Sequence, residues 1–157
     1  MANIMRWRYG DTNPVVMRVP EDLTVEIGDL VYESDGEALP ATALADAGTK
    51  AANQEAFHDA FVGVAMQCSP AGSVDAIRIA TSGVFEFDAV EAPFAVGALV
   101  GIDEDGSGSQ LEPQQVIAVA TPNLAIGRCA KAAVEASTRV LVDVVSTTLK
   151  GGPQAMA

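Results

Sequence analysis

VEIGDLVYESDGEAL, residues 25–39, has the pattern of two β-strands followed by an acidic turn. Apolar and polar residues alternate up to Ile27 with a period of two, which is typical of a strand with one buried face. Gly28 and Asp29 interrupt the alternation and predict a bulge or a tight turn. Strand character resumes at Leu30 and ends at Asp35-Gly36, a pair that can adopt the positive φ of a hairpin turn. The stretch predicts β structure and contains no nucleophile or general base.

A second stretch, FAVGALVGIDEDGSGSQL at residues 94–111, repeats this order of strand, glycine, strand and acidic turn. In both copies a variable segment, an apolar residue next to a glycine and an outgoing strand follow. Three pairs of segments correspond: 28–31 with 97–100, 62–65 with 126–129, and 76–82 with 140–147. Each glycine predicts a sharp bend or the close approach of another strand, and the Leu-Val pair after it should point into a core. We interpret the chain as two related β units that bury a shared interior.

The rest of the chain fits a mostly β domain. Short β-prone runs with turn signals roughly every 8–12 residues predict a small β-barrel or sandwich. Residues 40–60 are rich in Ala, so we expect a short helix or a loop excursion there, with Thr49 as a possible N-cap. The predicted organisation is an extended N-terminal arm over residues 1–20, a β domain over 21–147 and a flexible C-terminal tail over 148–157.

Charge and composition narrow the classes of function. The chain of 157 residues is 49% hydrophobic and has a net charge of −12. It is long enough for one domain, and it repels phosphate backbones and anionic lipid. We therefore expect no direct nucleic-acid partner and no membrane partner, and no run approaches the roughly 18 apolar residues that span a bilayer. Two cysteines make no disulfide framework, which favours synthesis in the cytoplasm with reduced thiols.

Positive charge is concentrated at the N-terminus. Residues 1–18 hold three arginines and one aspartate, a net charge of +3 − 1 = +2, so the remaining residues carry −14. Such a terminus is commonly solvated, but it could instead dock on an acidic neighbour, such as another copy of the chain. Removing residues 1–13 should then weaken the contact and leave the core folded. Because Trp, Tyr and Arg are frequent interface anchors, the candidate contact residues are Arg6, Trp7, Arg8, Tyr9 and Arg18.

The two-unit pattern also resembles a known family. The matching segments are FVGVA (61–65), TSGVFEF (81–87), VGALV (96–100) with its acidic turn, and IGRC (126–129). They are similar to segments of the small capsid cement, or decoration, proteins of tailed bacteriophages, although Cys129 stands where that family has Ala. The resemblance covers about residues 23–146. The excursion at 40–60 is long for the family, and the two terminal segments match nothing in it.

The resemblance implies a structural protein with a β-barrel-like domain on the outer surface of an icosahedral head, in the virion and made in the host cytoplasm. Its partners would be the major capsid protein and other copies of itself, commonly as a homotrimer. It would bridge capsid subunits against internal DNA pressure, with no cofactor and no catalytic or metal site. Two other classes stay open from the residues alone: a ligand- or carbohydrate-binding β module, which would need an exposed aromatic platform, and a small hydrolase.

A hydrolase would have to use His58, the only histidine, or the carboxylates of Glu86, Asp88 and Glu91. His58 lies in the Ala-rich excursion without a recognisable nucleophile motif, and is expected at a surface or an interface. Glu86 and Asp88 alternate on one strand, so they share a face that is ordinarily solvated. These residues favour a non-catalytic protein.

A metal site is equally poorly supported. Cys68 and Cys129, one in each unit, lack the close ligand pairs of a zinc site, and we expect both to be buried apolar thiols. The run DEDGSGS places Asp103 and Asp105 as in a calcium loop, but position 12 from Asp103 is Gln114 rather than Glu. We expect a solvated hairpin, and a weak cation site at a subunit junction is the alternative.

Overall fold

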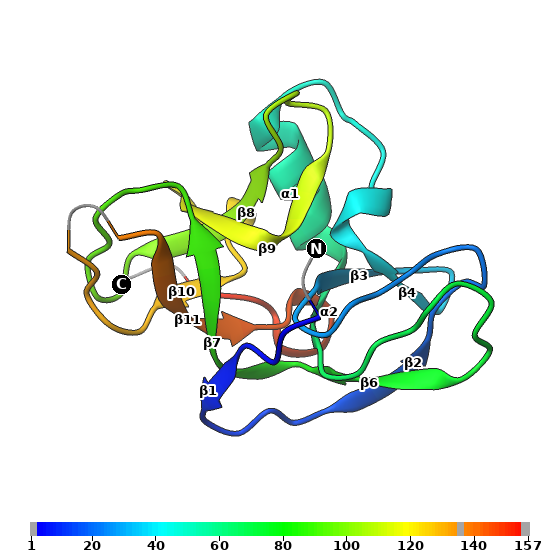
Figure 1. Ribbon diagram of the computed structural model, residues 1–157. Helices are drawn as coiled ribbons and strands as arrows, with labels where there is room; N and C mark the ends of the chain where they lie inside the picture. The colour runs from blue at the N-terminus through cyan, green and yellow to red at the C-terminus, as the bar shows by residue number, and fades with distance from the viewer. Residues whose placement is uncertain (1–2, 135–136, 155–157) are drawn as a thin grey trace.

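The computed structural model describes residues 3–134 and 137–154. Over these residues the protein is mostly β, with two strand assemblies side by side and short helices (Figure 1). This confirms the fold class predicted from the repeat.

The first unit is a five-stranded sheet with the strand order β2-β6-β5-β3-β4, in which all neighbours are antiparallel. Its strands are β2 (Val15–Arg18), β3 (Leu30–Ser34), β4 (Glu37–Pro40), β5 (Phe61–Ala65) and β6 (Ala76–Ala80).

The second unit has the order β1-β7-β11-β10-β8-β9, and a parallel pairing between β7 and β9 closes five of these strands into a barrel. Its strands are β1 (Trp7–Tyr9), β7 (Ser82–Ala89), β8 (Leu99–Glu104), β9 (Leu111–Ala118), β10 (Gly127–Cys129) and β11 (Arg139–Val145). When β1 is set aside, the two units have the same strand order, so the sequence repeat corresponds to a repeated topology.

The repeat extends to single hydrogen bonds. Gly28 and Gly97 both adopt positive φ, 97° and 83°, in the left-handed region that glycine enters without steric cost. The Gly28 N–H donates to Ala65 O at 2.9 Å, and the Gly97 N–H donates to Cys129 O at 2.8 Å. Each glycine therefore turns the chain toward the equivalent strand of its unit, which is β5 for Gly28 and β10 for Gly97.

Gly63 and Gly127 are also equivalent, and they mark the close strand approach that the sequence predicts. A Cβ atom on Gly63 would lie 1.8 Å from Ala80 O, and one on Gly127 would lie 2.2 Å from Asp143 O. Because the obstructing atoms belong to the backbone of the next strand, no side chain fits at either position.

The excursion between the strands is a helix, as the Ala-rich composition indicates. After a short 3₁₀ turn, η1 (Ala41–Ala43), the helix α1 (Lys50–Ala60) begins at Thr49, whose hydroxyl accepts a hydrogen bond from the Ala52 N–H at 3.1 Å. Two further short helical segments are η2 (Pro122–Leu124) and α2 (Thr147–Lys150). No helix of the described residues is both long and apolar enough to span a membrane.

The main core is shared between the units. Buried side chains of both units and of α1 form one cluster, which includes Leu30, Phe57, Phe61, Phe85, Phe87, Ile102 and Val142. A second, smaller cluster lies within the first unit. The Leu-Val pairs point inward as expected, except that Leu99 is only half-buried.

The segment expected as a flexible tail has defined structure through residue 154. Helix α2 packs beside α1 and ends at Gly151, which has φ 81°. Gly152 and Pro153 are buried after it, and Arg128 donates to the Gln154 carbonyl. The last part of the predicted tail, 155–157, lies outside the described residues.

Candidate functional site

The N-terminal segment runs across both units. The Ile4 N–H donates to Ile27 O in the first unit at 3.0 Å. Strand β1 then pairs with β7 of the second unit, and β2 pairs with β6 of the first. The segment expected as an arm is extended, and two of its stretches are edge strands of the two sheets.

Arg6 fixes this segment to the second unit. It was expected at the surface, but only 5% of the residue is exposed. Its Nε donates to Gln114 Oε1 at 2.8 Å, its Nη1 donates to Glu86 O at 3.1 Å, and its Nη2 lies 3.1 Å from Asp88 Oδ2. The expectation of a contact at Arg6 with another protein is therefore incompatible with its position, because its donors already bind within the chain.

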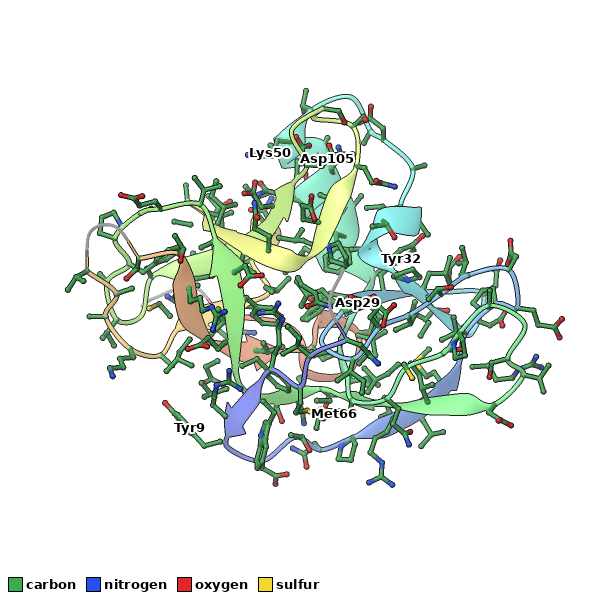
Figure 2. The ribbon with its side chains drawn as sticks, viewed as in Figure 1. Tyr9, Asp29, Tyr32, Lys50, Met66 and Asp105 are labelled. Atoms are coloured by element: carbon green, nitrogen blue, oxygen red, sulfur yellow. The ribbon has the colours of Figure 1, made fainter. Side chains whose placement is uncertain are left out.

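The same network continues into the first unit. Gln114, which is 0% exposed, donates through Nε2 to Asp29 Oδ1 at 2.8 Å and to Ile27 O at 3.3 Å. Asp29 Oδ2 accepts from the Glu26 N–H at 2.9 Å. Figure 2 shows Asp29 in the interior, where the two units meet. The chain Arg6–Gln114–Asp29 therefore joins the N-terminal segment to both units.

Burial dominates the electrostatics of Asp29. Removal from water raises the pKa of its carboxyl above the ordinary value, and the hydrogen bonds from Gln114 and from the Glu26 N–H oppose that shift. Sequence reasoning missed this network, since it treated Asp29 as a strand break and Gln114 as a failed calcium ligand. The sequence did offer one signal for a buried polar contact, because the polar Gln114 stands beside the apolar run that follows it.

Outside this buried anchor, the N-terminal segment presents exposed apolar side chains. We define the β1 flank as Ile4, Met5, Trp7 and Tyr9. Trp7 is 40% exposed and Tyr9 52% exposed, and Figure 2 shows Tyr9 pointing away from the molecule at the end of β1. Trp7 is held by a hydrogen bond from its Nε1 to Gly10 O at 3.0 Å.

The other predicted contact arginines are at the surface. Arg8 Nη2 lies 3.1 Å from Glu86 Oε1 on β7, and Arg18 Nη2 lies 3.9 Å from Glu21 Oε1. Arg18 stands on β2, in the other sheet from Trp7 and Tyr9. The structure therefore brings Trp7, Arg8 and Tyr9 together, buries Arg6 beneath them and separates Arg18.

Two of the three carboxylates considered for hydrolysis, Glu86 and Asp88, are partners of arginines, whereas Glu91 is exposed after the end of β7. Glu86 contacts Arg8 and, at 3.6 Å, Arg139. Asp88 contacts Arg6 and, at 3.8 Å, Arg139. These ion pairs link β7 to the N-terminal segment and to β11, which is a structural use of the two side chains.

His58 and the two cysteines have separate surroundings. His58 Nδ1 lies 2.8 Å from Ala125 O, so the half-buried ring connects α1 to the segment after η2. Cys129 is buried as expected, but Cys68 is exposed. The expectation for Cys68 was wrong because the strand position equivalent to Cys129 is Ala65, and residue 68 already lies in the following loop. In the described parts of the chain, no three His, Cys, Asp or Glu residues lie close enough to hold a metal ion.

The acidic turn of the second unit is only partly solvated. Asp105 is half-buried and accepts from Ser107 Oγ at 2.6 Å, a bond that lowers the pKa of its carboxyl. Asp103 was expected in the same solvated hairpin but is buried, where it accepts from Lys50 Nζ at 3.0 Å and Gln115 Nε2 at 2.9 Å. Asp103 therefore ties α1 to the hairpin.

Comparison with known protein families identifies the family of this chain. A family model described as phage cement protein matches residues 33–144, from β3 to β11 and so across most of both units. The chain belongs to the phage cement protein family. No curated protein matches the sequence.

Family membership gives this cement protein a role as capsid cement and a location on the phage capsid. The matched range contains both repeated glycines of close approach, Gly63 and Gly127, and helix α1. It begins after β1 and β2, so the β1 flank of the cement protein lies outside the matched region. A structural, non-catalytic protein is consistent with this membership.

Proposed function

We propose that this cement protein binds the outer surface of an icosahedral phage head and bridges neighbouring major capsid subunits. Its binding stiffens the shell against the pressure of the packaged DNA. The observation that carries the proposal, beyond family membership, is the β1 flank, in which exposed aromatic side chains stand on a strand that a buried arginine anchors.

The flank has the properties of a pre-organised contact surface. Trp and Tyr contribute large contact areas with few rotatable bonds, and they are enriched among residues that dominate binding energy. Because Arg6 and the pairing of β1 with β7 already fix the strand, little conformational entropy remains to be lost on docking. Trp7 and Tyr9 are therefore our proposed capsid contacts, with Arg8 beside them.

We further propose that the protein assembles as a homotrimer on the shell. Each contact of one copy with a capsid subunit then needs only modest energy, because linkage raises the effective concentration of the other two contacts. In this proposal the protein acts without catalysis, makes no direct contact with nucleic acid or membrane, and is made in the host cytoplasm before it joins the virion.

Co-sedimentation with undecorated shells tests the proposal. Wild-type protein should sediment with the shells and raise the temperature at which they rupture, whereas the double variant Trp7→Ala, Tyr9→Ala should lose at least about tenfold in affinity, as expected for interface anchors. Val96→Ala is the matched control, because Val96 is an exposed apolar residue of the second unit outside the flank. Full occupancy by the double variant would contradict the flank as the contact, and absence of wild-type protein from the shell pellet would contradict the function.

A further inference from the structure

The two units differ where each barrel would close. In the second unit, Asp88 and Ala89 of β7 pair in parallel with Gln115 and Val116 of β9. When the two units are aligned by the registers of their paired strands, Arg18 of β2 corresponds to Asp88 of β7, and Glu37 of β4 corresponds to Gln115 of β9. Among the described residues, β2 pairs only with β6 and β4 only with β3. The first unit therefore has an open seam between β2 and β4.

A proline lies near the end of each strand that borders this seam. Pro20 follows β2 after one intervening residue, Val19, and Pro40 ends β4. Their counterparts in the closed barrel are Val90 and Ala118, both of which retain an N–H donor. Proline has no such donor, so neither Pro20 nor Pro40 can donate a backbone hydrogen bond that would extend a ladder across the seam.

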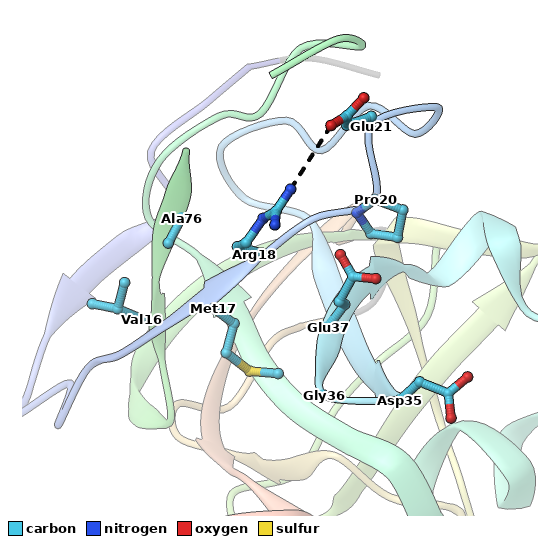
Figure 3. Close-up of a pocket in the computed structure, with 9 residues that line it drawn as sticks. All are labelled: Val16, Met17, Arg18, Pro20, Glu21, Asp35, Gly36, Glu37 and Ala76. Carbon is cyan, nitrogen blue, oxygen red and sulfur yellow. Dashed lines mark ion pairs between the residues drawn. The ribbon is translucent and has the colours of Figure 1, made fainter. Parts of the chain in front are cut away.

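A pocket of about 630 Å³ occupies the open seam. Its walls are Val16–Arg18 of β2 on one side and the β3–β4 turn, Asp35–Glu37, on the other (Figure 3). Val16 of β2 is 64% exposed beside this pocket. An unpaired strand edge presents free N–H and C=O groups that a further strand can use.

The charge around the pocket selects its occupant. Glu21, Asp35 and Glu37 oppose the single cation Arg18, a net charge of −3 + 1 = −2. Arg18 is itself engaged by Glu21 at 3.9 Å. An incoming segment with Lys or Arg therefore fits, whereas the acidic body of a second copy, which carries −14 outside its N-terminal segment, is repelled from this seam.

We propose that the seam receives an extended, Lys- or Arg-bearing segment of the capsid subunit, which adds as a strand to the free edge of β2. This inference rests on the proposed function, because it takes the shell as the source of the segment. The added strand hydrogen-bonds to the backbone of Val15–Arg18, covers Val16, and places its basic side chains against Glu21 and Glu37. The β2 seam and the β1 flank are then two separate contacts of one copy with the shell.

The first experiment is an NMR titration of the isotope-labelled full chain with a short synthetic peptide of alternating Lys and Val. The amide signals of β2 and of Glu37 should shift. A peptide of alternating Lys and Pro has the same charge but cannot add as a strand, and a peptide of alternating Glu and Val has the opposite charge, so neither should shift these signals. Shifts of the same amides by the Lys-Pro peptide would mean attraction by charge alone and would overturn the proposal.

Charge-reversal variants locate the site. Glu37→Lys should weaken binding of the Lys-Val peptide by about tenfold, since it replaces an attraction by a repulsion at short range. Glu91→Lys changes the net charge equally at an exposed position in the second unit and should leave the affinity unchanged. Should Glu37→Lys lower the thermal midpoint, Glu21→Lys serves as the second variant. Equal affinities of the Glu37→Lys and Glu91→Lys proteins would overturn the seam as the binding site.

Shell binding separates this proposal from the proposed function. Shells that bind wild-type and Glu37→Lys protein equally would leave the function standing and overturn the seam contact. Failure of wild-type protein to bind shells, with the peptide still bound, would overturn the capsid subunit as the source of the segment. If Glu37→Lys changes the self-association measured by sedimentation equilibrium, the occupant is a second copy, which also contradicts the proposal.

Discussion

At the scale of single residues, the Arg6–Gln114–Asp29 chain is the feature on which the N-terminal segment depends. Gln114 is the central residue of this hydrogen-bonded network, because it accepts from Arg6 and donates to Asp29. Neither charged partner has water to replace a lost bond, since both are almost fully buried. The amide of Gln114 can do both tasks only because it has one acceptor and one donor group.

Gln114→Ala should therefore be strongly destabilising. It removes one hydrogen-bond partner from the buried Arg6 Nε and one from the buried Asp29 Oδ1, at a cost of about 3 kcal/mol in the free energy of unfolding. Urea denaturation measures this value. Gln110→Ala is the control, because the exposed Gln110 side chain donates a hydrogen bond to Thr42 O at 3.0 Å, and its loss should cost less than about 1 kcal/mol. Equal costs for the two variants would contradict a bridging role of Gln114.

The raised pKa of Asp29 has a definite consequence for pH dependence. The folded state holds the Asp29 proton more tightly than the unfolded chain does, so it binds more protons between the ordinary aspartate pKa and the raised one. The contribution of Asp29 to stability is full below the ordinary pKa and is lost as the pH rises through the raised value. The difference in unfolding free energy between wild type and Asp29→Asn should fall over that window in a series of urea titrations, and a difference that is constant with pH would contradict this origin.

At the scale of elements, the repeated glycines show how much of the fold the sequence could predict. Alternation and glycine spacing identified both β units, and Thr49 with the Ala-rich run identified α1, because these signals are local. The pairing of β1 with β7 and the bond between Gln114 and Asp29 join residues far apart in the chain. Only the folded topology brings them together, so no local pattern could predict the buried position of Arg6 or the open seam.

Gly127→Ala tests the close approach of strands within the repeat. The new Cβ would overlap Asp143 O of β11, and since a backbone atom cannot move without shifting the strand, we expect a loss of about 3 kcal/mol, the cost of severe overpacking. Gly63→Ala should behave in the same way in the first unit. Gly106→Ala is the control, because its Cβ meets nothing within 4 Å and should change stability by less than about 1 kcal/mol. A Gly127→Ala protein as stable as the control would contradict the close approach of β11 at this glycine.

At the scale of the whole molecule, the N-terminal segment combines two tasks. Its inward side chain, Arg6, belongs to the buried network between the units, and its outward side chains, Trp7 and Tyr9, form the proposed capsid contact. The sequence indicates the second task through its Trp, Tyr and Arg content. It does not indicate the first, because composition cannot tell an arginine that faces inward from its neighbours that face outward.

Deletion of residues 1–13 should consequently do more than weaken docking. The deletion removes β1 and Arg6 and leaves Gln114 and Asp88 without that partner, so the core should fold with lower stability. Because Asp88 is partly solvated, we expect a loss of about 2–4 kcal/mol in the free energy of unfolding. Thermal and urea denaturation of the truncated protein measure this loss.

The double variant Trp7→Ala, Tyr9→Ala is the matched comparison for the deletion, because it removes the exposed side chains and keeps Arg6. It should unfold within about 1 kcal/mol of wild type, as expected for exposed positions, while it loses shell affinity. A truncated protein with wild-type stability would contradict the anchoring role of Arg6. Loss of shell binding in the truncated protein but not in the double variant would mean that the segment serves the fold alone, and that the capsid contact lies elsewhere on the molecule.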